Sequence, residues 1–351
     1  MKKRENKRRR IPESLGNRVC GVWTYILVLV FDAAVHGALL FFHGLTFQNF
    51  FRSFFSFLFF IYPLHYVADA LWSLRPSVCT ILSGKILVNR KYYMNTVRKE
   101  VVREELLPVT VSIPVYLESN EVIFNTMQEA LAAAKTYREF GGAAANVVVS
   151  DDGIAPLLGG SCTREKAEAL FHALDNDVSV LTQPERKAAE RIRFYRTNDI
   201  PFVIRPAEGR AGYFKKASNL NYTLKLGNAS TSGASLKELT KEQGTFAGGY
   251  WEGDITTHEV ILLLDKDSGV KAGIIEAILP EFAYDEKLAY VQCATNAGNL
   301  DENYYTYATG RHTNSLFHNI WPCKALQGFF VPLVGHNVFI RKTLLEKSGL
   351  W

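Results

Sequence analysis

Two long apolar stretches fill most of the first 75 residues and constrain the fold of this chain more than any other feature. They run from residue 22 to 47 and from residue 50 to 74, and each is long enough to cross a bilayer as a helix of about 20 residues. A secretory signal has a shorter apolar region of roughly 7–15 residues and a small-residue cleavage site, and neither stretch fits that pattern. We therefore predict two transmembrane helices within residues 22–75.

A strongly basic segment precedes the first apolar stretch. Lysine and arginine dominate positions 2–10, and the whole chain carries a formal net charge of +5. A nucleic-acid-binding tail and a solvated tail are alternatives, but the positive-inside rule favours a cytosolic tail over residues 1–21. Two spans then return the chain to the cytosol, so we expect a multi-pass integral membrane protein with a cytosolic catalytic domain and no nucleic-acid partner.

Two ionisable residues lie within the first apolar stretch. Asp32 and His36 are four residues apart, which places them one helical turn apart on the same face. An ionisable residue inside a membrane is a functional-site hypothesis by default, and a hydrogen-bonded pair at the interface between the two helices is an equal alternative. We assign the pair no role from the sequence.

The pattern changes after a basic, amphipathic segment, residues 76–107, which we interpret as a connector at the membrane interface. Runs of β-branched residues at 109–115 and 146–150 are typical of buried strands, and helical periodicity occupies 121–140 between them. Strand, helix, strand is typical of α/β folds with a parallel sheet. The further expected elements are strands at 202–205 and 260–264, helices within 164–196 and from 216, and an inserted surface segment at 227–259. We predict a mostly parallel α/β domain over residues 108–351.

Acidic residues follow three of the predicted strands, where open α/β sheets bind their ligands. Glu118 follows the first strand, and Asp151 and Asp152 follow the second. Asp265 and Asp267 follow the apolar strand 260–264 with one residue between them, so both carboxylates can reach one hard cation. An isolated Asp-x-Asp is common in exposed turns, but its position directly after a buried strand favours a metal site.

A lysine opens the helix that begins near residue 216. Cations at a helix amino terminus are disfavoured by the helix macrodipole, so a bound anion near Lys216 is a natural reason for its position. The alternative is that Lys216 and its neighbour Lys215 are merely solvated. The neighbouring motifs favour the anion.

Taken together, these motifs resemble glycosyltransferase family 2, specifically its membrane polysaccharide synthase branch of cellulose, chitin and hyaluronan synthases. The matching segments, in chain order, are Ser112-Ile-Pro-Val-Tyr-Leu-Glu118, Val149-Ser-Asp-Asp-Gly153, Lys216-Ala-Ser-Asn-Leu-Asn221 and Leu264-Asp-Lys-Asp-Ser268. The resemblance implies a GT-A nucleotide-diphospho-sugar transferase fold. It also implies a UDP-sugar donor and a Mn²⁺ or Mg²⁺ cofactor.

The resemblance implies a role for each matched position. Glu118, Asp151 and Asp152 would hold the uridine and ribose, and Lys216 would contact the diphosphate. Asp265 would stand near the donor, and Asp267 would bind the metal ion directly. The full set of donor-binding positions is Pro114, Tyr116, Glu118, Asp151, Asp152, Lys216, Asn219 and Asp265, with Asp265 and Asp267 as the catalytic and metal-binding pair.

A fifth segment resembles the region of the family that acceptor sugars approach. Gly335-His-Asn-Val-Phe-Ile-Arg341 is followed by Leu345-Glu-Lys-Ser-Gly-Leu-Trp351, and the first of these is similar to bacterial membrane β-glucan glucosyltransferases. The implied acceptor-side residues are His336, Asn337 and Arg341. This similarity favours UDP-glucose as the donor.

The resemblance therefore implies inverting transfer of a hexose to a growing β-linked polysaccharide. The family's Glu-Asp base and its Gln-x-x-Arg-Trp motif do not occur up to Trp351, so we expect this chain to bind the donor but to transfer poorly. The alternatives are a non-processive transferase acting on a lipid or protein, and an inactive, truncated scaffold that binds UDP-sugars. A haloacid-dehalogenase phosphatase would need Thr or Val where this chain has Gly269, and no P-loop motif is present.

Overall fold

The structure of this protein is a computed structural model that describes residues 15–59, 106–141, 144–208, 210, 215–231, 248–321 and 331–351. The chain falls into two compact units, Met1–Thr96 with Ala294–Pro332 and Val97–Cys293 with Leu333–Trp351. Most of the predicted basic tail, the end of the second apolar stretch and nearly all of the connector lie outside the described residues. Each unit is described by itself.

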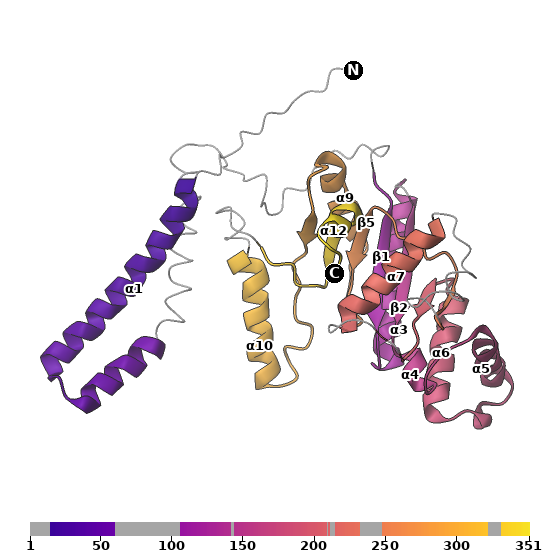
Figure 1. Cartoon of the computed structure of the whole chain (residues 1–351), viewed down its shortest axis with the longest axis horizontal. Helices are drawn as coiled ribbons and strands as arrows, with labels where there is room; N and C mark the ends of the chain where they lie inside the picture. The colour runs from indigo at the N-terminus through magenta and orange to yellow at the C-terminus, as the bar shows by residue number, and fades with distance from the viewer. Residues whose placement is uncertain are drawn as a thin grey trace, which may run out of the picture. The chain divides into compact units, whose positions relative to one another are not determined.

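The second unit contains a seven-stranded sheet with the order β4-β3-β2-β1-β5-β7-β6 (Figure 1). The four neighbouring strands β3, β2, β1 and β5 are parallel, and β4, β7 and β6 are antiparallel to their neighbours. The strands are β1 (Val109–Val115), β2 (Ala145–Asp151), β3 (Phe202–Ile204), β4 (Tyr250–Glu252), β5 (Val260–Leu263), β6 (Tyr290–Gln292) and β7 (Val338–Arg341). This mostly parallel mixed sheet confirms the predicted α/β class and fits a GT-A fold.

Helices cover both faces of this sheet because the strands are apolar on both sides. Val111 and Ile113 of β1 belong to the larger hydrophobic core, and the intervening Ser112 faces the opposite side, as the two-residue period of a strand requires. The larger core contains buried side chains of α3 (Asn120–Glu139), α5 (Arg164–Asn176), α6 (Gln183–Thr197) and α9 (Ile274–Tyr284). The opposite face packs against α7 (Lys215–Thr231) and α12 (Lys342–Lys347).

The region predicted to be helical at 164–196 contains the two helices α5 and α6. A 3₁₀ turn at Val178–Val180 separates α5 from α6, and Thr182 begins α6 with a capping box that includes Glu185. The short helix α4 (Ile154–Leu157) follows β2 directly. The capping box satisfies backbone N–H groups that would otherwise lack partners at the start of α6.

The segment predicted as an insert, residues 227–259, contributes to the domain at both of its ends. Helix α7 continues to Thr231, and β4 pairs with β3 as an edge strand. Leu226 and Ile255 are buried together beneath the sheet, and Trp251 packs against them. The Ser- and Gly-rich composition indicated a surface loop, but these apolar side chains hold the flanks of the segment in the fold. Residues 232–247 lie outside the described residues.

The other unit contains α1 (Leu15–His43) and a second helical segment at 47–59, which follows a turn at Gly44 (Figure 1). Among the described residues, the segment Ile26–His43 is the one long and apolar enough to cross a membrane by length and composition. The same unit includes α10 (Tyr304–Ser315) and the π-helical turn Leu316–Ile320. The two-helix transmembrane hairpin remains a prediction.

Asp32 and His36 form a hydrogen-bonded group where α1 meets the segment 47–59. His36 Nδ1 lies 3.3 Å from a carboxylate oxygen of Asp32, and His36 Nε2 lies 3.1 Å from the Ser56 hydroxyl. Ser53 also donates a hydrogen bond to the backbone carbonyl of His36. Of the two alternatives left open by the sequence, the structure thus contains the polar pair at a helix–helix contact.

Candidate functional site

The carboxyl ends of β1 and β5 lie side by side because these two strands are parallel neighbours. Asp265, at the end of β5, faces the amino terminus of α7, where Lys216 Nζ lies 3.3 Å from its Oδ1. The same ammonium group donates a hydrogen bond of 2.9 Å to the carbonyl of Gly335. Lys216 therefore joins the Asp-x-Asp turn, the start of α7 and the loop before β7 at one point.

His336 adjoins this group and interacts electrostatically with Asp265, Lys216 and Asp267. Burial lowers the pKa of His336, and the two carboxylates oppose that shift without overcoming it. The imidazole is therefore neutral near pH 7. Asp267 is exposed at the rim. The structure thus brings together Lys216, both aspartates of the motif and one of the predicted acceptor-side residues.

Glu118 is held on both of its carboxylate oxygens. One accepts a hydrogen bond of 2.8 Å from the Tyr116 N–H, and the other lies 3.2 Å from Lys266 Nζ. Burial alone would raise the pKa of Glu118, but the backbone N–H groups and Lys266 outweigh it and lower that pKa. Tyr116 is 38% exposed, and Lys215 Nζ lies 6.0 Å from the centroid of its ring.

Asp151 is placed differently from the other acidic candidates, because its side chain is fully buried. Its carboxylate lies 3.2 Å from the guanidinium of Arg191, which is also fully buried, and accepts a hydrogen bond of 2.7 Å from the Tyr195 hydroxyl. The backbone N–H groups of Gly153 and Ile154 donate to it as well. The protein itself satisfies this carboxylate, so direct contact of Asp151 with a nucleotide stays a prediction.

Arg191 also fixes the loop that follows β1. It donates hydrogen bonds to the carbonyls of Tyr116 at 2.6 Å and Glu118 at 2.8 Å. Gly153 allows this close packing, since a Cβ there would lie 1.8 Å from the Tyr116 carbonyl oxygen. The sequence contained one signal for this role: Arg191 lies among the buried positions Ala188, Ala189, Ile192 and Tyr195 of α6, where an unpaired charge would be very unfavourable.

Asp152 forms a second ion pair, this time with Arg205. Both contacts of this bidentate pair measure 2.6 Å, and Arg205 also donates to the Ser218 hydroxyl and the Lys215 carbonyl. The pair therefore ties the ends of β2 and β3 to the start of α7. Arg210 Nη1 lies 3.7 Å from the same carboxylate. The sequence interpretation did not identify either arginine.

Pro114 and Asn219 lie beneath the site and are buried. Pro114 is part of β1 and stands opposite Ser150 of β2. The amide of Asn219 donates a hydrogen bond of 2.8 Å to the Ser150 carbonyl, and its side-chain oxygen is buried without a hydrogen-bond partner among the described residues. These two residues support the strand ends from below, and their contact with a donor stays a prediction.

The structure does not bring Arg341 together with the other acceptor-side candidates. β7 is antiparallel to β5, so Val338 stands opposite Leu263 near Asp265, whereas Arg341 stands opposite Val260 at the other end of the strand. Arg341 donates to backbone carbonyls, including 2.6 Å to Phe282. His336 and Asn337 lie at the site end of β7, with Asn337 buried in the left-handed region at φ 49°.

The donor set at Asp265 and Asp267 suits a hard divalent cation, because such ions take oxygen ligands and often share them with substrate phosphates. No group of three or more His, Cys, Asp or Glu side chains placed to hold a metal occurs within the described residues. Two carboxylates would thus contribute only part of a coordination shell. Phosphate and water oxygens are the natural remaining ligands.

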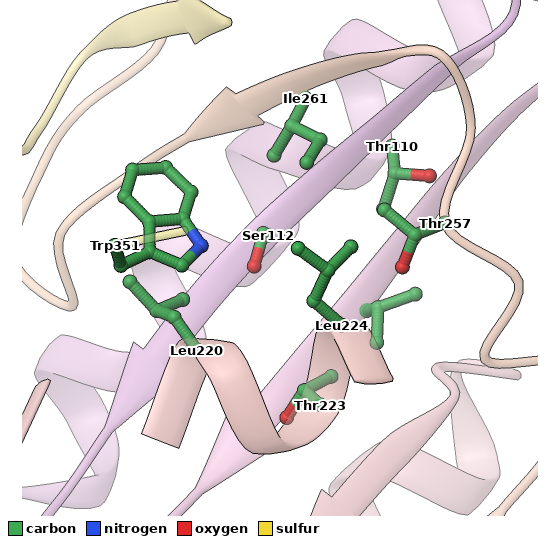
Figure 2. A pocket seen from close by; sticks show the side chains of 9 residues that line it. Thr110, Ser112, Leu220, Thr223, Leu224, Thr257, Ile261 and Trp351 are labelled. Carbon is green, nitrogen blue, oxygen red and sulfur yellow. The ribbon is translucent and has the colours of Figure 1, made fainter. Parts of the chain in front are cut away.

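A separate small cavity lies beneath α7 and is distinct from this site. Figure 2 shows Leu220 and Leu224 of α7 facing Ser112, Ile261 and the ring of Trp351. Its volume is about 10 Å³, room for about one water molecule. It lies along the middle of the strands rather than at their carboxyl ends, so it has no room for a nucleotide and belongs to the packing of α7.

A protein-family model described as Glycosyl transferase family group 2 matches residues 260–351. The matched range begins with β5, contains Asp265, Asp267 and His336, and covers about a quarter of the chain. No curated protein matches the chain. The match supports membership of glycosyltransferase family 2 and a transferase activity in general; proteins of this family use nucleotide-sugar donors, often with a divalent metal ion.

Proposed function

We propose that this chain is an inverting glycosyltransferase that binds a UDP-sugar at the carboxyl ends of β1, β2 and β5. The observation that carries the proposal is the contact of Lys216 with Asp265, beside the exposed Asp267. The ammonium group of Lys216 on α7 thus meets the turn after β5 that carries both carboxylates, and this turn lies within the range matched by the family model. Such a set suits a diphosphate together with a divalent cation.

In this proposal each half of the donor has its own residues. Tyr116 and Glu118 line the nucleoside end, to which the family resemblance also assigns the buried Asp151 and Asp152. Lys216 lies at the diphosphate end, where its ammonium group stabilises the negative charge of the UDP leaving group. Asp265 and Asp267 would hold Mn²⁺ or Mg²⁺, which when bound supplies further positive charge to the same leaving group. His336 and Asn337 lie where an acceptor hydroxyl would approach.

We further propose that the donor is UDP-glucose and the acceptor a growing β-linked polysaccharide made at a membrane. The support is the segment Gly335–Arg341, which lies within the family-model match, and the apolar helix segment Ile26–His43, which suits a membrane anchor. A lipid or protein acceptor is the alternative within the same reaction class.

Calorimetric titration of UDP into the detergent-solubilised chain, with and without Mn²⁺, tests the donor site. We expect Mn²⁺ to tighten UDP binding and Asp267→Ala to remove that gain, a loss of at least about tenfold. Asp175→Ala is the matched control, because Asp175 is 48% exposed on α5 and pairs with a surface arginine, Arg193. A folded wild-type chain that fails to bind UDP under either condition contradicts the proposal.

Incorporation of radiolabelled sugar tests the donor and the acceptor. Membranes containing the chain are supplied with labelled UDP-glucose, UDP-N-acetylglucosamine or UDP-galactose, and products are separated into polymer, lipid and protein fractions. Transfer by this chain is expected to be poor, and the proposal expects the label that is transferred to come from UDP-glucose and to lie in the polymer fraction, from which a β-glucanase releases it. Label confined to lipid or protein would support the alternative acceptor.

A further inference from the structure

Lys266, the middle residue of the Asp-x-Asp turn, spans two loops at the candidate donor site. Its backbone is held in place, since its N–H donates to Asp265 at 3.2 Å and its carbonyl accepts a hydrogen bond of 2.9 Å from the Thr126 hydroxyl on α3. From this fixed backbone its side chain reaches the loop after β1, where Nζ lies 3.2 Å from Glu118. The contact joins residues 148 positions apart, 266 minus 118.

Both side chains of this ion pair are partly buried, at 31% exposure for Lys266 and 24% for Glu118. The other oxygen of Glu118 accepts from the Tyr116 N–H, so the carboxylate is held between its own loop and the β5 turn. Two fixed contacts on one carboxylate select a single side-chain conformation. The hydrogen bond from the Tyr116 N–H also fixes the carboxylate against the backbone of Tyr116, a residue that is itself exposed.

We propose that Lys266 is a positioning residue for the nucleoside half of the donor: it holds Glu118, and with it the Tyr116 loop, in the orientation that binds uridine. This inference rests on the proposed UDP-sugar site. Lys216 and Lys266 then have separate tasks. Lys216 acts at the diphosphate end through Asp265, and Lys266 acts at the nucleoside end through Glu118.

Because Lys216 and Lys266 act on different halves of the donor, their effects can be told apart by comparing uridine binding with UDP binding. Uridine carries no phosphate, so a residue that acts on the nucleoside half affects the affinity for uridine and the affinity for UDP alike. A residue that acts on the diphosphate affects the affinity for UDP and leaves the affinity for uridine unchanged. Uridine is the decisive ligand for Lys266, because Lys266 also interacts electrostatically with Asp265 and Asp267, and its effect on UDP binding therefore includes a part that depends on Mn²⁺.

The test measures uridine binding by saturation-transfer NMR and UDP binding by calorimetry, with and without Mn²⁺, on the detergent-solubilised chain. We expect Lys266→Met to weaken both ligands by about three- to tenfold, and Lys266→Arg, which keeps the charge, to restore binding to within about twofold of wild type. Lys135→Met is the control, because Lys135 is 70% exposed on α3. Thermal unfolding confirms that each variant is folded.

A double-mutant cycle with Glu118→Gln separates positioning from direct contact. If Lys266 acts through Glu118, Lys266→Met causes little further loss in the Glu118→Gln background, since coupled residues are non-additive. Additive losses, or a loss confined to UDP, overturn the inference while leaving the donor site intact. Unchanged affinity in Lys266→Met also overturns it. Absence of any UDP binding by the wild-type chain removes both this inference and the proposed function.

Discussion

The guanidinium of Arg191 and the carboxylate of Asp151 form an ion pair at 3.2 Å, with neither side chain exposed to solvent. Removing two charges from water costs several kcal/mol for each ion, and their attraction offsets that cost only where further hydrogen bonds complete both groups. The Tyr195 hydroxyl donates a further hydrogen bond to Asp151, and Arg191 donates hydrogen bonds to the carbonyls of Tyr116 and Glu118. The pair thus couples the end of β2 to the loop carrying two candidate donor-binding residues.

Removing Arg191 should therefore be strongly destabilising. We expect Arg191→Met to lower the free energy of unfolding by about 3–5 kcal/mol, because Asp151 is left buried without its counter-charge. Arg193→Met, on the same helix, should cost less than about 1 kcal/mol, since Arg193 is 47% exposed. Urea denaturation of the detergent-solubilised variants measures both values. Equal stability of the two variants would show that the buried pair contributes little.

Gly153 should tolerate no side chain. In Gly153→Ala the new Cβ would lie 1.8 Å from the Tyr116 carbonyl oxygen and 2.6 Å from Arg191, so the loop after β1 must move. We expect a loss of stability of about 1–3 kcal/mol together with weaker UDP binding. Gly298→Ala is the control, because its Cβ meets open space. Thermal unfolding and UDP titration provide the readouts, and wild-type behaviour of Gly153→Ala would contradict the packing described.

Acidification should destabilise the sheet unit through His258. Burial lowers the pKa of His258 below 6.5, with Lys342 acting in the same direction and Asp254 opposing. The unfolded chain therefore binds more protons than the folded chain as the pH falls through the unfolded-state value, and stability falls with it. Urea unfolding between about pH 8 and about pH 5 should show this slope, and His258→Gln should reduce it to the part contributed by His336, whose pKa burial also lowers. An unchanged slope in the variant would show that other titratable groups cause the pH dependence of stability.

The apolar segment of α1 provides a test of membrane insertion. Val35 is 41% exposed near the middle of Ile26–His43, so Val35→Arg places a charge where insertion costs about 2.5–3.5 kcal/mol. We expect more of this variant than of wild type in the alkaline-carbonate supernatant of membranes. Leu45→Arg, in the turn after α1 and 83% exposed, should remain in the pellet. Equal extraction of Val35→Arg and wild type would argue against insertion of this segment.

Residues that are neighbours in the chain determined much of the fold. The strands at 109–115 and 260–264 were predicted because β-branched and aliphatic runs favour a buried strand over any alternative, and the structure has β1 and β5 at those positions. The acidic residues directly after them were placed at the ligand-binding edge by the same local argument. The segment 227–259 was less predictable, because a Ser- and Gly-rich composition does not show which of its apolar residues will be buried.

The sequence by itself therefore determined four of the seven strands, β1, β2, β3 and β5, together with their ends and the acidic residues that follow them; β4, β6 and β7 appeared only in the structure. Only the tertiary structure decided which of these groups lie together at the strand ends, which are satisfied internally, and which lie elsewhere. Asp151 and Glu118 look alike in sequence, yet Arg191 satisfies the first within the core and Lys266 holds the second at the rim. These partners are 40 and 148 positions away, and strand order and helix packing, which no local pattern encodes, bring them together.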